Sequence, residues 1–236
     1  MNYCVIKKKY QSIVGFRLHD QLLYLVSPFF TLLFLKLRVI PNVVTLFMII
    51  FGVLGACFYA IPGSLFKIIG IILIYLWYIM DCSDGEVARI TKRFSLYGKE
   101  IDYTAHVIDH PLFTLAFMIN LIDIGYYYVF LIGSLGFLDT IYRHLCSFDI
   151  IKELKEGPFD NGSKVNSNDD MRFRLSRIPN IIFYNISSFP QFVLFFPIVL
   201  LLDIKLSLLY TSVVFFATLL KVLIGVKNWI EYILYK

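Results

Sequence analysis

The segment DCSDGEVARITKRFSLYGKEIDYTAHVID, residues Asp81 to Asp109, decides the fold because it places acidic residues at the ends of two apolar helices. Carboxylates beside a bilayer are energetically costly, so they usually mark a functional site. Two helical stripes can be drawn through the segment, one with Asp81, Asp84, Gly85 and Ala88 and the other with Asp102, Ala105, His106 and Asp109. If the stripes face each other, their oxygen ligands suit Mg²⁺ or Mn²⁺, which complete their shells with phosphates. The segment therefore indicates a site for phosphoryl chemistry.

The composition places the chain in a membrane. Hydrophobic residues make up 58% of the 236 residues and charged residues only 17%, and the mean hydropathy is +0.73. A soluble domain of this length could not bury so much apolar surface. We therefore expect an all-α integral membrane protein, with a single membrane domain over residues 1–236.

Six apolar stretches are long enough to cross a bilayer, which requires roughly 20 residues each. They lie at about residues 43–61, 64–82, 103–121, 124–142, 181–202 and 206–226. Together they predict a bundle of six transmembrane helices over residues 43–226. The polar residues 147–180 are expected to form a cytoplasmic loop between the fourth and fifth helices.

A further helix is expected before the first span. The apolar residues of segment 20–41 recur at helical spacing, but the segment ends in Lys36 and Arg38, so we expect an amphipathic helix lying in the cytoplasmic interface. Pro41 then breaks this helix, and Asn42 is expected to cap the next one.

The basic residues predict the orientation through the positive-inside rule. With a cytoplasmic N-terminus, all of the 22 lysines and arginines except Lys67 and Lys205 fall on the cytoplasmic side. This predicts a multi-pass protein of the cell membrane with both termini and the acidic cluster on the cytoplasmic side, where nucleotide substrates are found. The net charge of +5 then follows from the topology. Because the basic residues form no single basic face, nucleic acid is not expected as a partner.

The acidic segment contains the pattern Asp81-x2-Asp84-Gly85-x2-Ala88-Arg89-x8-Gly98-x3-Asp102. This pattern resembles the motif of the class I CDP-alcohol phosphatidyltransferase family, whose members also have six membrane helices after an interfacial helix. A second point of resemblance is a Pro-Asn-x2-Thr element before the first span, formed here by Pro41, Asn42 and Thr45. The resemblance in topology covers nearly the whole chain.

The resemblance implies a reaction and a cofactor. An acceptor hydroxyl, on a polar alcohol or a lipid, would attack the phosphorus of a CDP-alcohol and release CMP, as in the synthesis of phospholipids and related phosphodiesters. Asp81, Asp84 and Asp102 would hold Mg²⁺ or Mn²⁺. The resemblance also implies a homodimer among membrane lipids. The residues that it assigns to the CDP moiety are Asn42, Thr45, Gly85, Arg89 and Ser95. Ala88, whose small side chain would let the helix approach the nucleotide closely, and the motif residue Gly98 are also expected to line the nucleotide site.

The chain departs from the family at one position. Where the family has a final Asp, which serves as metal ligand and general base, this chain has His106. An imidazole, with a reference pKa of about 6.5, is a better-matched base near neutral pH than a carboxylate at about 3.9, but it is a poorer Mg²⁺ ligand than oxygen. Three interpretations stay open: His106 is the catalytic base, Asp109 supplies the missing catalytic carboxylate, or the protein is a degenerate member without activity. The carboxylate of Asp109 could also orient the ring of His106.

Two other function classes use carboxylates within a membrane. An intramembrane Mg²⁺-dependent prenyltransferase also has Asp-x-x-Asp sites, but it does not explain the Gly-x2-Ala-Arg residues that follow. A cation transporter would use the carboxylates as its pathway, yet transporters are often built from repeats and the sequence shows none.

Four polar residues outside the motif have plainer interpretations. Arg143 is favoured as a positive-inside anchor over a ligand for an acceptor phosphate or a lipid headgroup. His110 is expected to be structural, and Asp139 to make a polar contact inside the bundle. Lys221 can extend its ammonium group to the interface.

Overall fold

The computed structural model describes residues 25–156, 182–183 and 185–234, together with Tyr3, Ile6 and Leu23. Every regular element among these residues is a helix, which confirms the all-α prediction. The long elements are α3 (Ser27–Lys36), α4 (Pro41–Ala60), α5 (Ser64–Thr91), α6 (Gly98–Leu121), α7 (Tyr126–Glu156), α10 (Phe189–Leu202) and α11 (Ile204–Leu234).

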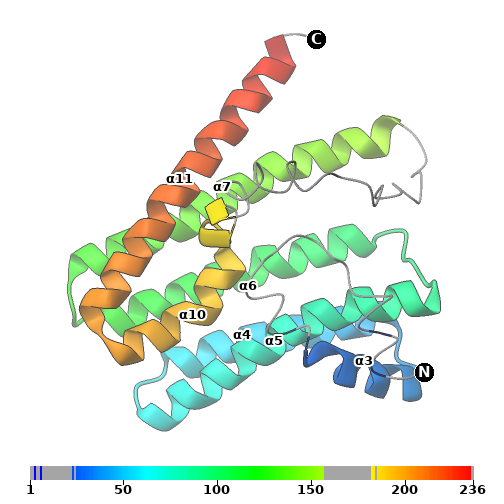
Figure 1. Ribbon diagram of the computed structural model, residues 1–236, viewed down its shortest axis with the longest axis horizontal. Helices are drawn as coiled ribbons and strands as arrows, with labels where there is room; N and C mark the ends of the chain where they lie inside the picture. Colours follow the sequence, from blue (N-terminus) through cyan, green and yellow to red (C-terminus); the bar gives the residue numbers. More distant parts are fainter. Residues whose placement is uncertain are drawn as a thin grey trace, which may run out of the picture.

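Successive helices run in opposite directions. In Figure 1 the turns that join α4 to α5, α6 to α7 and α10 to α11 lie at one end of the molecule. The loop between α5 and α6 lies at the opposite end, close to the N-terminus of α4 and to α3. This arrangement brings the C-terminal half of α5 and the N-terminal half of α6 to the same end of the bundle, so the two acidic stripes can meet.

Among the described residues, four helices are long and apolar enough to cross a membrane: Pro41–Ala60, Ser64–Thr91, Tyr126–Cys146 and Ile204–Glu231. The other two predicted spans correspond to the helices α6 and α10, but α10 begins only at Phe189 and not at residue 181, because the backbone at Ser188 is extended. Polar residues such as His106 and Asp109 interrupt the apolar sequence of α6, and α10 has only 14 residues. The structure therefore supports a helical membrane protein, while the sixfold crossing stays a prediction.

Glycines allow α4 to pack closely against α5 and α6. A Cβ atom on Gly70 of α5 would lie 2.6 Å from the backbone nitrogen of Tyr59 in α4. A Cβ atom on Gly52 of α4 would lie 2.5 Å from the carboxyl group of Asp109 in α6. Small residues of this kind are typical of membrane helix interfaces, where close backbone approach gives van der Waals contact. The core below these contacts is aromatic and includes the buried side chains of Trp77 and Phe117.

Helix α3 is tied to α5 by a buried carboxylate. The fully buried Glu86 of α5 accepts hydrogen bonds from Ser27 Oγ at 2.7 Å and from Thr31 Oγ1 at 2.6 Å. The opposite side of α3 exposes Phe29 and Leu33. The hydroxyl groups of Ser27 and Thr31 thus point into the protein, while Phe29 and Leu33 point outward; the position of α3 in a membrane interface stays a prediction. Residues 20–22 and 24 of the predicted interfacial helix lie outside the described residues.

Other predicted boundaries also need correction, among them the end of the last span, since α11 continues past residue 226 to Leu234. Asn42 does not cap α4, because Ile40 is the N-cap residue and the helix already begins at Pro41, a position that tolerates proline since its missing N–H would have no partner there. Helix α5 continues past residue 82 to Thr91. Helix α7 continues through residue 147, the predicted start of the loop, to Glu156. The predictions ended each span where the apolar residues end, whereas a helix can extend beyond the bilayer with charged residues that favour helix. The rest of the predicted loop, residues 157–180, lies outside the described residues.

Candidate active site

The two acidic stripes meet around His106. Its Nε2 atom lies 3.5 Å from Asp81 Oδ1 of α5 and 3.6 Å from Asp102 Oδ1, one turn earlier on α6. The ligand atoms of these three residues all lie within 4.8 Å of one another. The side chain of Asp102 is 48% exposed and that of Asp81 23% exposed, so both carboxylates are partly accessible from outside the protein.

Asp84 lies next to this cluster and is held by α4. Its Oδ2 atom accepts a hydrogen bond of 2.7 Å from Thr45 Oγ1. Thr45 is buried and belongs to the Pro-Asn-x2-Thr element, so the structure joins the two segments that the sequence identified separately. One carboxylate oxygen of Asp84 is occupied by this contact, and Asp84 is not among the three residues whose ligand atoms cluster.

The residues assigned to the nucleotide gather at the same end of the bundle. Gly85 leaves room for the side chain of Arg89, because a Cβ atom at residue 85 would lie 2.9 Å from Arg89 Nη1. Ser95 is exposed in the loop between α5 and α6, and its Oγ accepts a hydrogen bond from the backbone nitrogen of Tyr97 at 3.3 Å. Gly98 begins α6. The remaining members are Asn42, the second residue of α4, and the partly buried Ala88 of α5.

Asp109 is directed away from the cluster, into the core. It is fully buried, and its Oδ2 accepts a hydrogen bond of 2.8 Å from Trp77 Nε1. The backbone of Gly52 covers the carboxyl group from the side of α4. Its other oxygen, Oδ1, is buried and has no hydrogen-bond partner among the described residues. The oxygens of Asp109 are therefore not among the ligand atoms that cluster around His106 Nε2, although Asp109 shares a helical stripe with Asp102 and His106.

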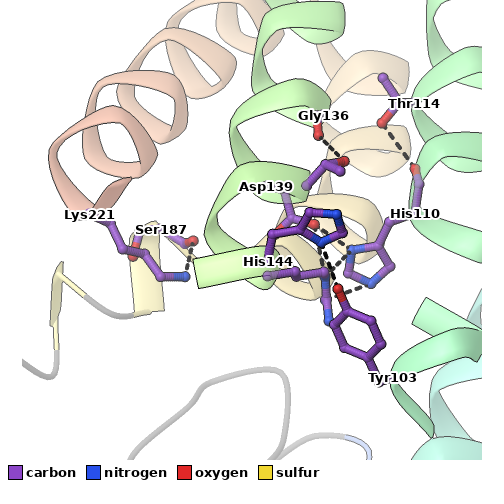
Figure 2. Close-up of polar contacts among 10 residues, drawn as sticks. Tyr103, His110, Thr114, Gly136, Asp139, His144, Ser187 and Lys221 are labelled. Carbon is purple, nitrogen blue, oxygen red and sulfur yellow. Dashed lines mark hydrogen bonds and ion pairs between the residues drawn. The ribbon is translucent and has the colours of Figure 1, made fainter. Parts of the chain in front are cut away.

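A buried ionic network lies beside the cluster, and Figure 2 shows how His110 of α6 points to Asp139 of α7. His110 Nδ1 lies 2.7 Å from Asp139 Oδ2, and Arg143 Nε donates to the same oxygen at 3.0 Å. The second ring nitrogen of His110, Nε2, lies 3.0 Å from Arg143 Nη2. A ring that donates from Nδ1 to Asp139 and accepts at Nε2 from Arg143 satisfies all three groups, so this geometry favours the neutral tautomer with the proton on Nδ1.

This network confirms the predicted polar contact of Asp139 and gives Arg143 a different role from the expected anchor. One part of this network can be read from the sequence. Asp139 and Arg143 are four residues apart, so they share a helix face. That spacing indicates an ion pair, but it does not reveal His110 as the third member.

Two more polar contacts surround the network in Figure 2. The Nζ atom of Lys221 in α11 lies 3.3 Å from the backbone oxygen of Ser187 and 3.8 Å from the ring centroid of Tyr142. The ammonium group of Lys221 therefore makes its contacts inside the bundle, whereas the sequence predicts that it extends to the membrane interface. Nearby, Tyr103 Oη lies 2.7 Å from Nδ1 of the exposed His144.

The cluster around His106 has a donor set that fits a divalent cation. Two carboxylates and one imidazole from two helices converge, and charged oxygen together with neutral nitrogen is a common donor set for such ions. The nitrogen and oxygen atoms stand slightly too far apart for strong direct hydrogen bonds, which are typically about 2.7–2.9 Å between charged groups. The residues present thus fit a metal centre that bridges α5 and α6.

Comparison with known families identifies the same region. Residues 38–226 match the sequence model of the family described as CDP-alcohol phosphatidyltransferase. The matched range includes the element at Thr45, the acidic residues of α5 and α6, and the network on α7. No curated protein sequence matches the chain.

Proposed function

Since the chain belongs to the CDP-alcohol phosphatidyltransferase family, we propose that it transfers a substituted phosphate from a CDP-alcohol to an acceptor hydroxyl and releases CMP. The family implies a CDP-alcohol donor and an alcohol acceptor. The observation that carries the proposal is the convergence of Asp81, Asp102 and His106, with Asp84 bound to Thr45 beside them. This arrangement supplies several negative oxygens where a pyrophosphate and its cation would bind.

The proposed reaction is a substitution at phosphorus. The oxygen of the acceptor hydroxyl forms a bond to the phosphorus that carries the alcohol, and the bond from this phosphorus to the bridging pyrophosphate oxygen breaks. The bond electrons leave with that oxygen, which becomes part of CMP, and the acceptor hydroxyl gives up its proton. A divalent cation held by Asp81, Asp84 and Asp102 would neutralise the pyrophosphate and stabilise the CMP leaving group.

The nucleotide is proposed to lie along α5 at the end near α4. Gly85 and Ala88 lack bulky side chains, so the helix can approach the nucleotide closely. Arg89 carries a planar guanidinium group that can bind phosphate oxygens in pairs. The remaining residues proposed on this side are Asn42, Thr45, Ser95 and Gly98.

The proton of the acceptor requires a base in contact with the substrate. Asp109 does not meet this requirement, since it is buried against Trp77 and Gly52. His106 Nε2 and the half-exposed carboxylate of Asp102 both face the centre. Of the two ring nitrogens of His106, only Nε2 faces the acidic centre. This nitrogen can bind a metal ion or accept a proton, but not both at once. The base role of His106 stays a prediction; if His106 binds the cation instead, the carboxylate of Asp102 is the group left to accept the proton.

We also propose that α4, α5, α6, α7, α10 and α11 each cross the cell membrane, with the site on the cytoplasmic side and lipids around the bundle. The alternating helix directions support six crossings. The polar residues Asp109, His110 and Asp139 are buried inside the protein, so α6 can cross although it is less apolar than its neighbours. A homodimer is proposed from the family resemblance alone.

The test is CMP release by the purified protein. Radiolabelled CDP-diacylglycerol and CDP-linked small alcohols should be supplied with polar and lipid acceptors in the presence of Mg²⁺ or Mn²⁺, and the Asp81→Asn variant serves as the inactive control. The expected result is CMP release by the wild type alone. If the folded wild type binds CDP-alcohols but releases no CMP from any of them, the proposal is wrong and the chain is a degenerate member.

A further inference from the structure

The two distances from His106 Nε2 to the neighbouring carboxylates match binding to a shared metal ion better than direct hydrogen bonding. Nε2 of His106 lies 3.5 and 3.6 Å from oxygens of Asp81 and Asp102. A direct N–H···O hydrogen bond has its donor and acceptor about 2.7–3.2 Å apart. Donors that bind one ion at about 2.0–2.2 Å each stand roughly 3–3.5 Å from one another. The lone pair of Nε2 is therefore placed where a metal ligand would be, between two carboxylates.

His106 is the one described histidine that can offer a nitrogen to this centre. Both ring nitrogens of His110 are engaged with Asp139 and Arg143, as Figure 2 shows for the contact to Asp139. His144 is exposed, and its Nδ1 is bound to Tyr103. His19 lies outside the described residues.

The second nitrogen of His106 also has a candidate partner. Nδ1 of His106 and Oδ1 of Asp109 are both buried, and neither has a hydrogen-bond partner among the described residues. The two residues lie one turn apart on α6. A histidine bound to a metal almost always donates its other ring N–H to a carboxylate, a carbonyl or water. Asp109 is fixed by Trp77 and Gly52 one turn along α6 from His106, which makes its Oδ1 atom the candidate acceptor for this N–H group.

We propose that His106 is a metal ligand through Nε2, that Asp109 is the carboxylate that orients its ring, and that this nitrogen makes the centre select Mn²⁺ over Mg²⁺. The inference rests on the proposed function for the cation's purpose, but the binding itself can be measured without turnover. Mg²⁺ prefers an octahedral shell of oxygen atoms, whereas imidazole suits the transition metals. A centre of two carboxylates and one imidazole therefore favours Mn²⁺ more than the all-carboxylate centre that the family motif implies.

The test uses the full chain in detergent with Mn²⁺ or Mg²⁺ alone. Pulsed electron paramagnetic resonance of bound Mn²⁺ should show coupling to a directly bound ¹⁴N nucleus. The coupling should disappear in His106→Asp and His106→Gln, and it should persist in the matched control His144→Asp. His106→Asp should also lower the ratio of Mn²⁺ affinity to Mg²⁺ affinity. Asp109→Asn should keep the nitrogen coupling but weaken Mn²⁺ binding about 10- to 100-fold.

The outcomes separate this inference from the proposed function. If the wild type binds Mn²⁺ without nitrogen coupling yet releases CMP, the ligand role of His106 is wrong and the reaction stands. If nitrogen coupling is present but no CDP-alcohol yields CMP, the ligand role stands and the reaction is wrong. Two replacements of His106 are used so that the misfolding of one, detected by size-exclusion chromatography, still leaves a variant that can contradict the inference.

Discussion

The most informative perturbation of the bundle is the removal of Asp139. Its carboxylate is the one negative partner that His110 and Arg143 share in the network described above. In the wild type its Oδ2 atom is 2.7 Å from His110 Nδ1 and 3.0 Å from Arg143 Nε. The Asp139→Ala variant would leave a guanidinium charge in the bundle without its carboxylate, and an imidazole N–H without its acceptor. Burying such groups without partners is costly.

The expected loss of stability can be estimated from the geometry. Removing one partner of a buried ion pair typically costs about 3–5 kcal/mol. The side chain of Arg143 is 20% exposed and can turn partly toward water. The loss of unfolding free energy in Asp139→Ala should therefore lie near the lower end of this range, at about 3 kcal/mol. Asp139→Asn keeps an acceptor for His110 but loses the charge, so its cost should be about 1.5–3 kcal/mol, the range for hydrogen bonds to charged groups.

The assay is unfolding by sodium dodecyl sulfate in mixed micelles, followed by circular dichroism. The exposed Asp123 provides the matched control, since Asp123→Ala should stay within about 0.5 kcal/mol of the wild type. The double variant Asp139→Leu/Arg143→Met should be more stable than Asp139→Ala, because it removes both charges together. If Asp139→Ala unfolds like the Asp123 control, the network contributes nothing to stability and our account of α6 and α7 is wrong.

Three further predictions concern the site, its packing and the topology. Asp84→Asn should abolish CMP release and leave the protein folded, and retained activity in this variant or in EDTA would contradict a metal-dependent reaction. Gly52→Ala should destabilise the protein by about 1–3 kcal/mol and reduce CMP release, because the new Cβ would collide with the carboxyl group of Asp109; Gly133→Ala, which meets only the flexible end of Met118, is its control. Reporters fused after Lys236 and inserted near residue 166 should both report the cytoplasm, and an opposite result from either would exclude six crossings.

The placement of the helices and much of the site could be predicted because both follow from periodicity along the chain. Long apolar runs locate membrane helices, and residues three or four apart share a helix face. Asp81 and Asp102 could therefore be assigned to two stripes before any contact was known, and the structure brings them together with His106. Thr45 was assigned to the same site through the family resemblance, and its hydrogen bond to Asp84 agrees with that assignment.

The side of each helix that faces its neighbours could not be predicted from the same periodicity. Asp109 shares a stripe with His106, yet the rotation of α6 against α4 and α5 directs it to Trp77 and Gly52. Arg143 was interpreted as an anchor because its position at the end of an apolar run resembles that of any interfacial arginine. Its pairing with His110 depends on how α6 lies against α7, which no local pattern in either helix specifies.

The polar residues of α6 show why this helix can carry a site at membrane depth. Within little more than one turn of α6, His106 meets a carboxylate of α5, Asp109 accepts a hydrogen bond from Trp77, which also belongs to α5, and His110 binds a carboxylate of α7. Each side chain that would be costly in lipid thus has a neighbour on another helix, and these neighbours are inside the protein. The three partners fix the rotation of α6 in the bundle, which in turn fixes the direction of His106 Nε2. The chemistry at the acidic centre and the packing of α5, α6 and α7 are therefore coupled, and a change at Asp139 that rotates α6 should weaken Mn²⁺ binding at a cluster it does not touch.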